Sequence, residues 1–388
     1  MIERLLYKKI IENLHDFPIC GLIGSRQVGK STLAKLIAKE TGKRCVYLDL
    51  ELPSDIQKLS DAELYFKQHS EDLIVIDEIQ RKPEIFPLIR SVVDDWSRNG
   101  CFLILGSASP DLIRQSSETL AGRIVYVELP PLVITEVGID LQKIYQLWLR
   151  GGYPRSFLAK TNEQSLQWRN AFRKTYLERD IPQLGIRVPS TMLDRFWQMI
   201  AHYHGQIWNA SSAAQSLGVS PPSCRHYLDI MVDTFIIRQL HPYFANVGKR
   251  LVKSPKIYFR DSGLLHMIQR IGSMEDLFSF PGVGASWEGF VIEQILNINP
   301  LQNDLFYYYR TAAGAEIDLL YFPKPFESPI AIEVKFSASP AVSKGFWEGI
   351  KDLKCIKGYV VYPGDDTYPL SKEVMVLPVS QIGTIFQS

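Results

Sequence analysis

Features of exported and membrane-spanning proteins are scarce in this sequence. Its five cysteines are widely spaced along 388 residues and include no C-x-x-C pair. We therefore expect small core residues in a reducing compartment, rather than disulfides or a zinc site. No apolar run is long enough to span a bilayer, and the N-terminal residues lack the pattern of a signal peptide. These absences predict a cytoplasmic protein with no membrane partner. The cysteines are Cys20, Cys45, Cys101, Cys224 and Cys355.

An excess of charge of one sign is also missing. The 43 lysines and arginines are balanced by 42 aspartates and glutamates, which gives a formal net charge of +1. This balance excludes a polycation, although one basic face could still bind nucleic acid. The sequence shows no internal repeat and no low-complexity tract. Its length and ordinary composition predict two or three globular domains.

What the sequence does contain is a phosphate-binding loop of the form G-x-x-x-x-G-K-[ST] at residues 24–31. An apolar run precedes the loop and a helical pattern follows it, which is the context that this chemistry requires. The glycines let backbone N–H groups close around phosphate oxygens at a helix N-terminus. Lys30 would reach the β- and γ-phosphates, and the Ser31 hydroxyl would ligate Mg²⁺. The predicted contacts to ATP or GTP are Gly24, Ser25, Arg26, Gln27, Val28, Gly29, Lys30, Ser31 and Thr32.

Four apolar runs after the loop predict buried strands of a parallel sheet with helices on both faces. Asp77 and Glu78 stand at the carboxyl end of one run, the edge where α/β sheets bind ligands. Asp77 would hold Mg²⁺ through water, and Glu78 would polarise the water that attacks the γ-phosphate. The alternative is a simple acidic strand cap. The runs are residues 44–50, 73–78, 101–107 and 124–129.

Two further positions are candidates for sensing or stabilising the γ-phosphate. Ser107 and Ser109 end the third apolar run, where a hydroxyl could sense this phosphate, although hydroxyls at strand ends are frequent. Arg123 lies just before the fourth run and could reach the nucleotide of a neighbouring subunit. It could equally be a surface arginine at the end of a helix.

Residues 18–155 resemble the AAA-type ATPase core of a prokaryotic family. The resemblance is carried by the motifs at residues 24–31, 76–80, 106–109, 120–123 and 151–154. It implies ATP with Mg²⁺ as the nucleotide and an oligomer, expected to be a hexamer, in which neighbours share the active site. The family's usual Asn or Thr sensor is replaced by Ser107 and Ser109. Arg155 is a candidate lid arginine.

A compact helix-turn-helix signal follows in the middle of the chain. Residues 209–220 predict a capped helix and a glycine turn, and Pro221 opens a second helix that carries Arg225. The basic segment 249–256 resembles the wing of a winged helix, whose lysines and arginines would neutralise DNA phosphates. Winged helices also bind proteins, so this alternative stays open. The predicted DNA contacts are Arg225, Lys249, Arg250, Lys253 and Lys256.

The last third carries acidic residues and a lysine in the order of a nuclease site. Glu288 lies on a predicted helix, Asp318 on a strand, and Glu333 and Lys335 two residues apart on another strand. This order resembles the catalytic set of the restriction-endonuclease-like superfamily, PD-(D/E)xK. The resemblance implies that Asp318 and Glu333 bind Mg²⁺, that Lys335 orients or deprotonates water, and that Glu288 completes the site.

The sequence as a whole therefore predicts an α/β protein with four parts. These are an AAA-type core (1–140), a helical lid (141–190), a winged helix (191–260) and an endonuclease-like α/β domain (261–388). The first functional hypothesis is an oligomeric ATPase that binds DNA and remodels or processes it. Two alternatives remain, a nucleotide-regulated switch that docks protein partners and an ATP-gated, Mg²⁺-dependent nuclease.

Overall fold

The structure is a computed structural model, and the chain forms two compact units. The first comprises residues 1–132 with 233–235, and the second residues 133–232 and 236–388. The structure describes residues 2–40, 42, 44–107, 118–244, 249–299, 304–324 and 327–387.

A five-stranded parallel sheet forms the centre of the first unit. Its strands are β1 (Ile19–Gly24), β2 (Cys45–Asp49), β3 (Leu73–Asp77), β4 (Phe102–Ser107) and β5 (Ile124–Glu128). They lie in the order β2-β3-β4-β1-β5, and all neighbouring strands are parallel. The predicted α/β core with a parallel sheet is confirmed, and the carboxyl ends of its strands share one edge.

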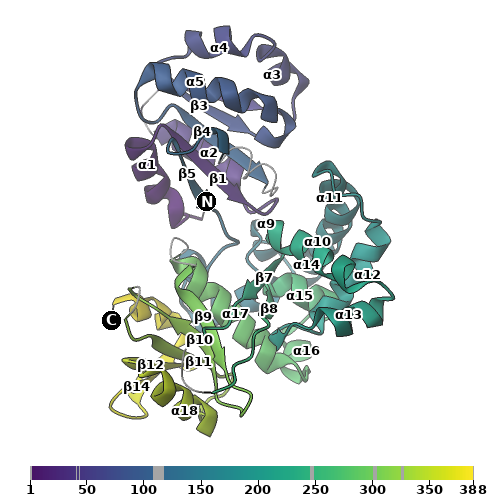
Figure 1. Ribbon diagram of the computed structural model, residues 1–388, viewed down its shortest axis with the longest axis vertical. Helices are drawn as coiled ribbons and strands as arrows, with labels where there is room; N and C mark the ends of the chain where they lie inside the picture. The colour runs from purple at the N-terminus through teal and green to yellow at the C-terminus, as the bar shows by residue number, and fades with distance from the viewer. Residues whose placement is uncertain are drawn as a thin grey trace. The chain divides into compact units, whose positions relative to one another are not determined.

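Helices cover both faces of this sheet (Figure 1). They are α1 (Leu6–Asp16), α2 (Lys30–Glu40), α3 (Pro53–Lys58), α4 (Ala62–Gln68) and α5 (Phe86–Trp96). Helices α1 and α2 contact β1, while α4 packs against α5. The ring centroids of Phe66 on α4 and Phe102 on β4 lie 5.3 Å apart. Because helices bury both faces, the strands are continuous apolar runs and do not alternate.

The second unit begins with short helices and continues into a helix-turn-helix. Asn209 caps α13 by accepting hydrogen bonds from the backbone N–H groups of Ser211 and Ser212. Gly218 ends that helix with a φ of +70°, a conformation that favours glycine. The helices are α7 (Ile134–Val137), α8 (Leu141–Arg150), α9 (Pro154–Phe157), α10 (Asn162–Thr175), α11 (Ile181–Gln183), α12 (Ser190–Ala201), α13 (Ala210–Leu217) and α14 (Pro221–Asp233), with a π-helical turn at Tyr176–Asp180. The turn predicted between two helices is confirmed.

A small antiparallel sheet completes this part of the unit. Its strands β6 (Gln206–Ile207), β7 (Ile237–Leu240) and β8 (Lys256–Phe259) lie in the order β6-β8-β7. The chain order α12–β6–α13–α14–β7–β8 is the one expected for a winged helix. Helices α15 (Ser262–Ile268), α16 (Met274–Ser279) and α17 (Val283–Ile298) follow.

The C-terminal part of the second unit is a six-stranded mixed sheet. Its elements are β9 (Phe306–Arg310), β10 (Glu316–Tyr321), β11 (Ile330–Val334), α18 (Lys344–Leu353), β12 (Lys357–Tyr362), β13 (Tyr368–Pro369) and β14 (Val374–Pro378), followed by 3₁₀ turns at Val379–Gln387. The strand order is β13-β14-β12-β11-β10-β9. Strands β10 and β11 are antiparallel, whereas β11, β12 and β14 are parallel.

The described residues between β7 and β8 (241–244 and 249–255, called the β7–β8 connection below) include segments that pair with the edge strand β9. The backbone carbonyl of Tyr308 accepts a hydrogen bond from the Tyr243 N–H, and the backbone N–H of Tyr308 donates one to His241 O. Further along, Val252 N–H donates to Arg310 O. The sequence led us to expect a free basic wing here, and this expectation is corrected. The edge of a sheet presents unpaired backbone groups, and this connection satisfies those of β9.

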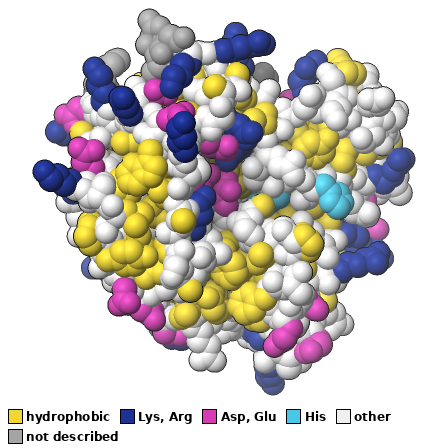
Figure 2. Space-filling model, turned by 90° about the horizontal axis from the view of Figure 1, so that it is seen from below, with side chains coloured by type: hydrophobic (Ala, Val, Ile, Leu, Met, Phe, Trp, Pro, Cys, Tyr) yellow, Lys and Arg dark blue, Asp and Glu magenta, His cyan; other side chains and the backbone are white. Residues whose placement is uncertain are grey.

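Charges of both signs are interspersed with apolar side chains on the face drawn in Figure 2, in keeping with the net charge of +1. Within the part of the chain that the structure describes, no helix is both long enough and apolar enough to cross a membrane.

Candidate functional site

The phosphate-binding loop leaves β1 and runs into the first turn of α2. Gly24 and Gly29 have φ angles of +147° and +104°, which side chains rarely adopt. A Cβ on Gly24 would also lie 2.5 Å from the carbonyl oxygen of Leu129. The two glycines of the motif are therefore required by backbone conformation and, at Gly24, by close packing.

Lys30 is buried, and its ammonium is turned onto the loop itself. It donates hydrogen bonds to Gly24 O and Ser25 O, each at 2.9 Å. Burial lowers the pKa of Lys30 to about 8, against the opposing attraction of Glu78 and Asp77. A bound phosphate would offer this ammonium a stronger partner than the two carbonyl groups.

The two residues predicted to hold Mg²⁺ are linked by a tyrosine that the sequence analysis missed. The Tyr47 hydroxyl, from β2, donates to Asp77 Oδ2 at 2.6 Å and also hydrogen-bonds to Ser31. Burial, followed by the hydrogen bond to Asp77, raises the pKa of Tyr47. Ser31 and Asp77 thus lie close to one phenol, as ligands of one cation would. Hydroxyl and carboxylate oxygens suit Mg²⁺, so these residues fit it.

Glu78 lies next to Asp77 in a left-handed conformation with a φ of +58°. Its carboxylate accepts a hydrogen bond from the side-chain amide of Gln80. Burial is the largest cause of a raised pKa for Glu78, although Lys30 opposes it. A carboxyl with a raised pKa is a stronger base once ionised, which suits the predicted role in polarising water.

Two arginines make contacts at the phosphate loop that the sequence analysis did not predict. Arg4 donates through Nη1 to Val28 O at 2.9 Å and through Nη2 to Pro130 O at 2.6 Å. Arg26 pairs with Glu51 at 3.0 Å. No local motif marks Arg4, because its partners lie 24 and 126 residues away in the sequence.

The other predicted loop contacts lie where the motif places them. Val28 and Ser25 are buried, Gln27 is exposed with a φ of +65°, and Thr32 is exposed on α2. The backbone of Ser107 pairs with Gly24 across β4 and β1, at the start of the loop. Ser109 lies outside the described residues.

Arg123 lies at the opposite edge of the sheet from the phosphate loop, since its neighbour Ile124 pairs with Ile19 at the start of β1. Its guanidinium makes a two-pronged contact with Asp94 on α5, at 2.5 and 2.9 Å. It therefore cannot reach the phosphate loop of its own chain.

The motif at residues 151–154 has a packing explanation within the second unit. Gly151 has a φ of +76°, and a Cβ there would lie 2.1 Å from Asp261 Oδ1. The Gly152 N–H donates to Asp261 Oδ2 at 2.7 Å. Arg155 is exposed on α9.

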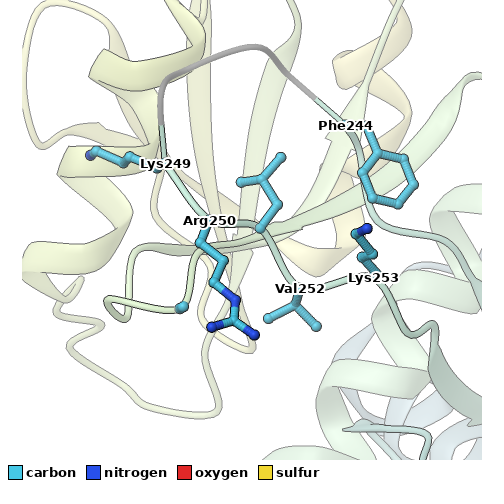
Figure 3. Close-up of a pocket in the computed structure, with 7 residues that line it drawn as sticks. Phe244, Lys249, Arg250, Val252 and Lys253 are labelled. Carbon is cyan, nitrogen blue, oxygen red and sulfur yellow. The ribbon is translucent and has the colours of Figure 1, made fainter.

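Three of the predicted DNA contacts are exposed on the β7–β8 connection, and Arg225 is exposed on α14. Arg250, Lys253 and Phe244 line a hollow of about 940 Å³, shown in Figure 3. Lys249 also borders it, but its ammonium is bound to Asp352 on α18 at 2.7 Å. Phe244 is 60% exposed. The hollow therefore combines two cationic side chains with an aromatic face.

The prediction that Lys256 contacts DNA is wrong. Lys256 is only 2% exposed and belongs to β8. Its ammonium lies 2.8 Å from Glu316 Oε1, 3.2 Å from Glu288 Oε1 and 3.7 Å from Asp318 Oδ1. Three carboxylates hold it inside the second unit, so it is not available to a phosphate. We call Glu288, Glu316 and Asp318 the acidic centre.

The structure brings together the residues of the predicted nuclease site. Glu333 and Lys335 lie on one face, as the strand period predicts, and form an ion pair at 2.6 Å. The Val334 N–H donates to Asp318 Oδ2 at 3.0 Å. Burial, then the charge of Asp318, raises the pKa of Glu333 to about 8, and burial with the charge of Glu288 raises that of Asp318.

Two members of this cluster were missed from the sequence. Glu316 lies two residues before Asp318 on the same strand, a spacing that could have indicated it. The Tyr258 hydroxyl donates to Glu288 Oε1 at 2.6 Å.

The cluster does not fit the Mg²⁺ that the endonuclease resemblance implies. Among the described residues, no group of three or more His, Cys, Asp or Glu side chains is arranged to hold a metal ion. The cations beside these carboxylates are ammonium groups of the chain, Lys335 at Glu333 and Lys256 at the acidic centre. Burial opposes the charge of Lys256, but the surrounding Tyr258, Glu288 and Asp318 outweigh burial and raise its pKa.

Comparison of the sequence with known proteins identifies its relatives. The uncharacterized proteins Rv2008c of Mycobacterium tuberculosis and Mb2031c of Mycobacterium bovis are each 44% identical over 374 residues. These matches cover 96% of this chain and 82% of each relative. The chain belongs to their family.

Three known domain families match successive parts of this chain. Residues 16–138 match an AAA domain, which confirms the AAA-type resemblance of the first unit. Residues 141–275 match a domain of unknown function, DUF8612, and residues 283–382 match another, DUF4143.

Solved structures show weaker similarity to this family member. The Walker-type ATPase of Pyrococcus abyssi is 14% identical, with a TM-score of 0.47, covering 69% of this chain and 96% of that one. The Holliday junction branch migration motor RuvB of Thermotoga maritima is 19% identical, with a TM-score of 0.34, covering 61% and 90%.

Proposed function

We propose that this chain hydrolyses ATP as a homo-oligomer, expected to be a hexamer, and uses the energy to remodel or process DNA. The observation that carries the ATPase proposal is the convergence of Lys30, Ser31 and Asp77 at one edge of the sheet. Tyr47 joins Ser31 to Asp77, and the Lys30 ammonium lies on the carbonyl groups of the loop.

The roles of the residues follow from their positions. Magnesium, when bound with the nucleotide, neutralises charge on the β- and γ-phosphates. Ser31 and Asp77 would hold it, and Lys30 would move its hydrogen bonds from the loop carbonyls to the phosphates. Glu78 would accept a proton from the attacking water at its carboxylate, once the hydrogen bond from Gln80 no longer engages it.

Single substitutions test the ATPase proposal. Lys30→Ala should abolish ATP turnover, and Glu78→Gln should retain ATP binding while turnover falls by about 10²–10⁴-fold. Lys39→Ala, an exposed lysine on the same helix, is the matched control. A Lys30→Ala protein that hydrolyses ATP at the wild-type rate would refute the proposal.

The DNA part of the proposal rests on the hollow lined by Arg250, Lys253 and Phe244. Cationic side chains neutralise phosphates, and an exposed aromatic ring can stack on an unpaired base. We expect Arg250→Ala and Lys253→Ala each to weaken DNA binding and to reduce the salt dependence of log K by about 1. Lys324→Ala, a lysine elsewhere on the surface, should leave both unchanged.

A nucleotide-regulated switch that docks protein partners is the alternative to a DNA-directed ATPase. Turnover measured with duplex, forked and four-way DNA separates the two hypotheses. Stimulation by any of the three supports the DNA-directed ATPase, whereas identical rates with and without all three support the switch.

A further inference from the structure

The acidic centre already contains a cation that belongs to the chain. Lys256 Nζ contacts carboxylates from two elements, Glu288 on α17 and the pair Glu316 and Asp318 on β10. We propose that the Lys256 ammonium is the resident cation of the acidic centre, so that this centre binds no divalent metal ion and instead joins β8 to the C-terminal sheet.

Lys256 occupies this position because its own strand places it there. The backbone of β8 is paired with both β6 and β7, so Lys256 lies on the central strand of its sheet. The aromatic ring of Tyr308 lies beside the side chain, with its centroid 5.7 Å from Nζ. Because the side chain is nearly excluded from solvent, water cannot replace its carboxylate partners, and loss of any of these contacts leaves charge unpaired inside the protein.

A divalent ion bound between the three carboxylates of the acidic centre would share the oxygens that Lys256 already contacts. Mg²⁺ binds carboxylate oxygens at about 2.0–2.1 Å and requires a near-octahedral shell of six ligands. The ammonium lies between 2.8 and 3.7 Å from one oxygen of each carboxylate. A metal bound to those oxygens would stand within a few ångströms of a second positive charge, and the repulsion opposes binding.

The remaining polar contacts fit a closed structural centre. Glu288 Oε1 also accepts a hydrogen bond from Tyr258, which lies two residues after Lys256 on the same strand. Glu316 Oε2 pairs with Arg310 on β9 at 3.1 Å. The carboxylates are therefore engaged by groups of the chain on more than one side.

Removing the ammonium tests the proposal directly. Manganese binding to the full-length, nucleotide-free chain would be followed by electron paramagnetic resonance, and the melting temperature would be measured with and without Mn²⁺. We expect the wild-type chain to have no Mn²⁺ site that depends on Asp318, so that Asp318→Asn leaves its Mn²⁺ binding unchanged. We expect Lys256→Met to melt at a lower temperature and to gain one Mn²⁺ site. When Mn²⁺ is tenfold above the dissociation constant of that site, it should raise the melting temperature by about 2–3 °C.

Matched variants make every outcome informative. Lys324→Met removes an exposed lysine outside the acidic centre and should bind Mn²⁺ and melt as the wild type does. A wild-type Mn²⁺ site that Asp318→Asn abolishes would overturn the proposal, as would plasmid cleavage with Mg²⁺ that depends on Asp318. So would a Lys256→Met protein that melts as the wild type and gains no site. If Lys256→Met does not fold, the wild-type and Asp318→Asn comparison still decides. A wild type without an Asp318-dependent site, together with a folded Lys256→Arg protein, then supports the proposal.

Discussion

Arg4 illustrates how a single residue distant in sequence can determine the shape of a binding loop. Its guanidinium joins the carbonyl of Val28, inside the phosphate loop, to that of Pro130, just after β5. The side chain is 8% exposed, so these bonds are shielded from water. Arg4 is a positioning residue, because it fixes the loop through the backbone carbonyl of Val28.

Replacing Arg4 should therefore weaken nucleotide binding before it affects the chemistry. We expect Arg4→Ala to raise the dissociation constant of Mg·ATP about tenfold, which corresponds to about 1.4 kcal/mol. Calorimetry measures this change, and Lys8→Ala, an exposed neighbour, is the control. A loss of turnover at saturating ATP, with an unchanged dissociation constant, would contradict the positioning role.

Lys30 should make nucleotide affinity depend on pH. In the free protein the pKa of Lys30 is lowered to about 8, chiefly by burial, whereas a bound phosphate favours the ammonium. The lysine is already protonated below pH 8, but above it binding must take up a proton. We expect the affinity for ATP to be about tenfold lower at pH 9 than at pH 7. Titrations in buffers of different ionisation enthalpy would detect the proton, and Lys30→Arg, if it binds, should show no such decrease.

Sequence reasoning succeeded at this scale where neighbours in the chain make the site. Lys30 and Ser31 are adjacent in one motif, and Asp77 ends a strand that is apolar throughout. Tyr47 and Arg4 reach the same site from other elements, and nothing near them in the sequence indicates it. Lys256 was misassigned because it follows exposed basic residues, while its burial depends on partners from α17 and β10.

At the scale of elements, the β7–β8 connection acts as an additional edge for the C-terminal sheet. Leu251 forms a bridge with Thr311, and Pro242 with Tyr308. Asp352 on α18 anchors the connection by accepting hydrogen bonds from Lys249 Nζ and from the Tyr309 hydroxyl. The helix, the connection and β9 thus depend on one carboxylate.

Replacing Asp352 should lower the free energy of unfolding more than replacing its partner Lys249. The Asp352 side chain is 15% exposed and that of Lys249 39% exposed, so Asp352→Ala leaves the hydroxyl of Tyr309 without its acceptor. We expect Asp352→Ala to lower stability by about 1–3 kcal/mol and Lys249→Ala by at most about 1 kcal/mol. Chemical denaturation would measure both. Equal losses would indicate that the ion pair, and not the buried hydrogen bond, carries the effect.

The strands of the parallel sheet in the first unit could be predicted because their apolar runs are short and continuous, whereas the sequence analysis identified only part of the C-terminal sheet. The pairing between the β7–β8 connection and β9 could not, since backbone hydrogen bonds leave no pattern of residue types. A basic stretch such as 249–253 has the same composition whether it projects into solvent or lies along a sheet edge.

At the scale of the whole molecule, the position of Arg123 makes the proposed oligomer testable. This arginine lies at the edge of the sheet opposite the phosphate loop and pairs with Asp94. It can therefore serve a nucleotide only in another copy of the chain, where an arginine would stabilise charge in the transition state.

Mixing two inactive variants tests this arrangement. Arg123→Ala retains its phosphate loop, and Lys30→Ala retains its arginine, so each alone should hydrolyse ATP poorly. In a mixed ring, about a quarter of the interfaces would combine an intact loop with an intact arginine. We expect turnover to recover accordingly, measured after the subunits have been exchanged. No recovery in rings shown to be mixed would exclude a role for Arg123 across the interface.

The central position of β1 also affects how the chain is made. This strand carries the phosphate loop, yet its two partners are residues 102–107 and 124–128. During synthesis, both segments must leave the ribosome before β1 has neighbours on both sides, because its parallel partners lie far along the chain. Until then its apolar side chains are exposed to other nascent chains, and we expect chaperones to bind the newly made N-terminal region.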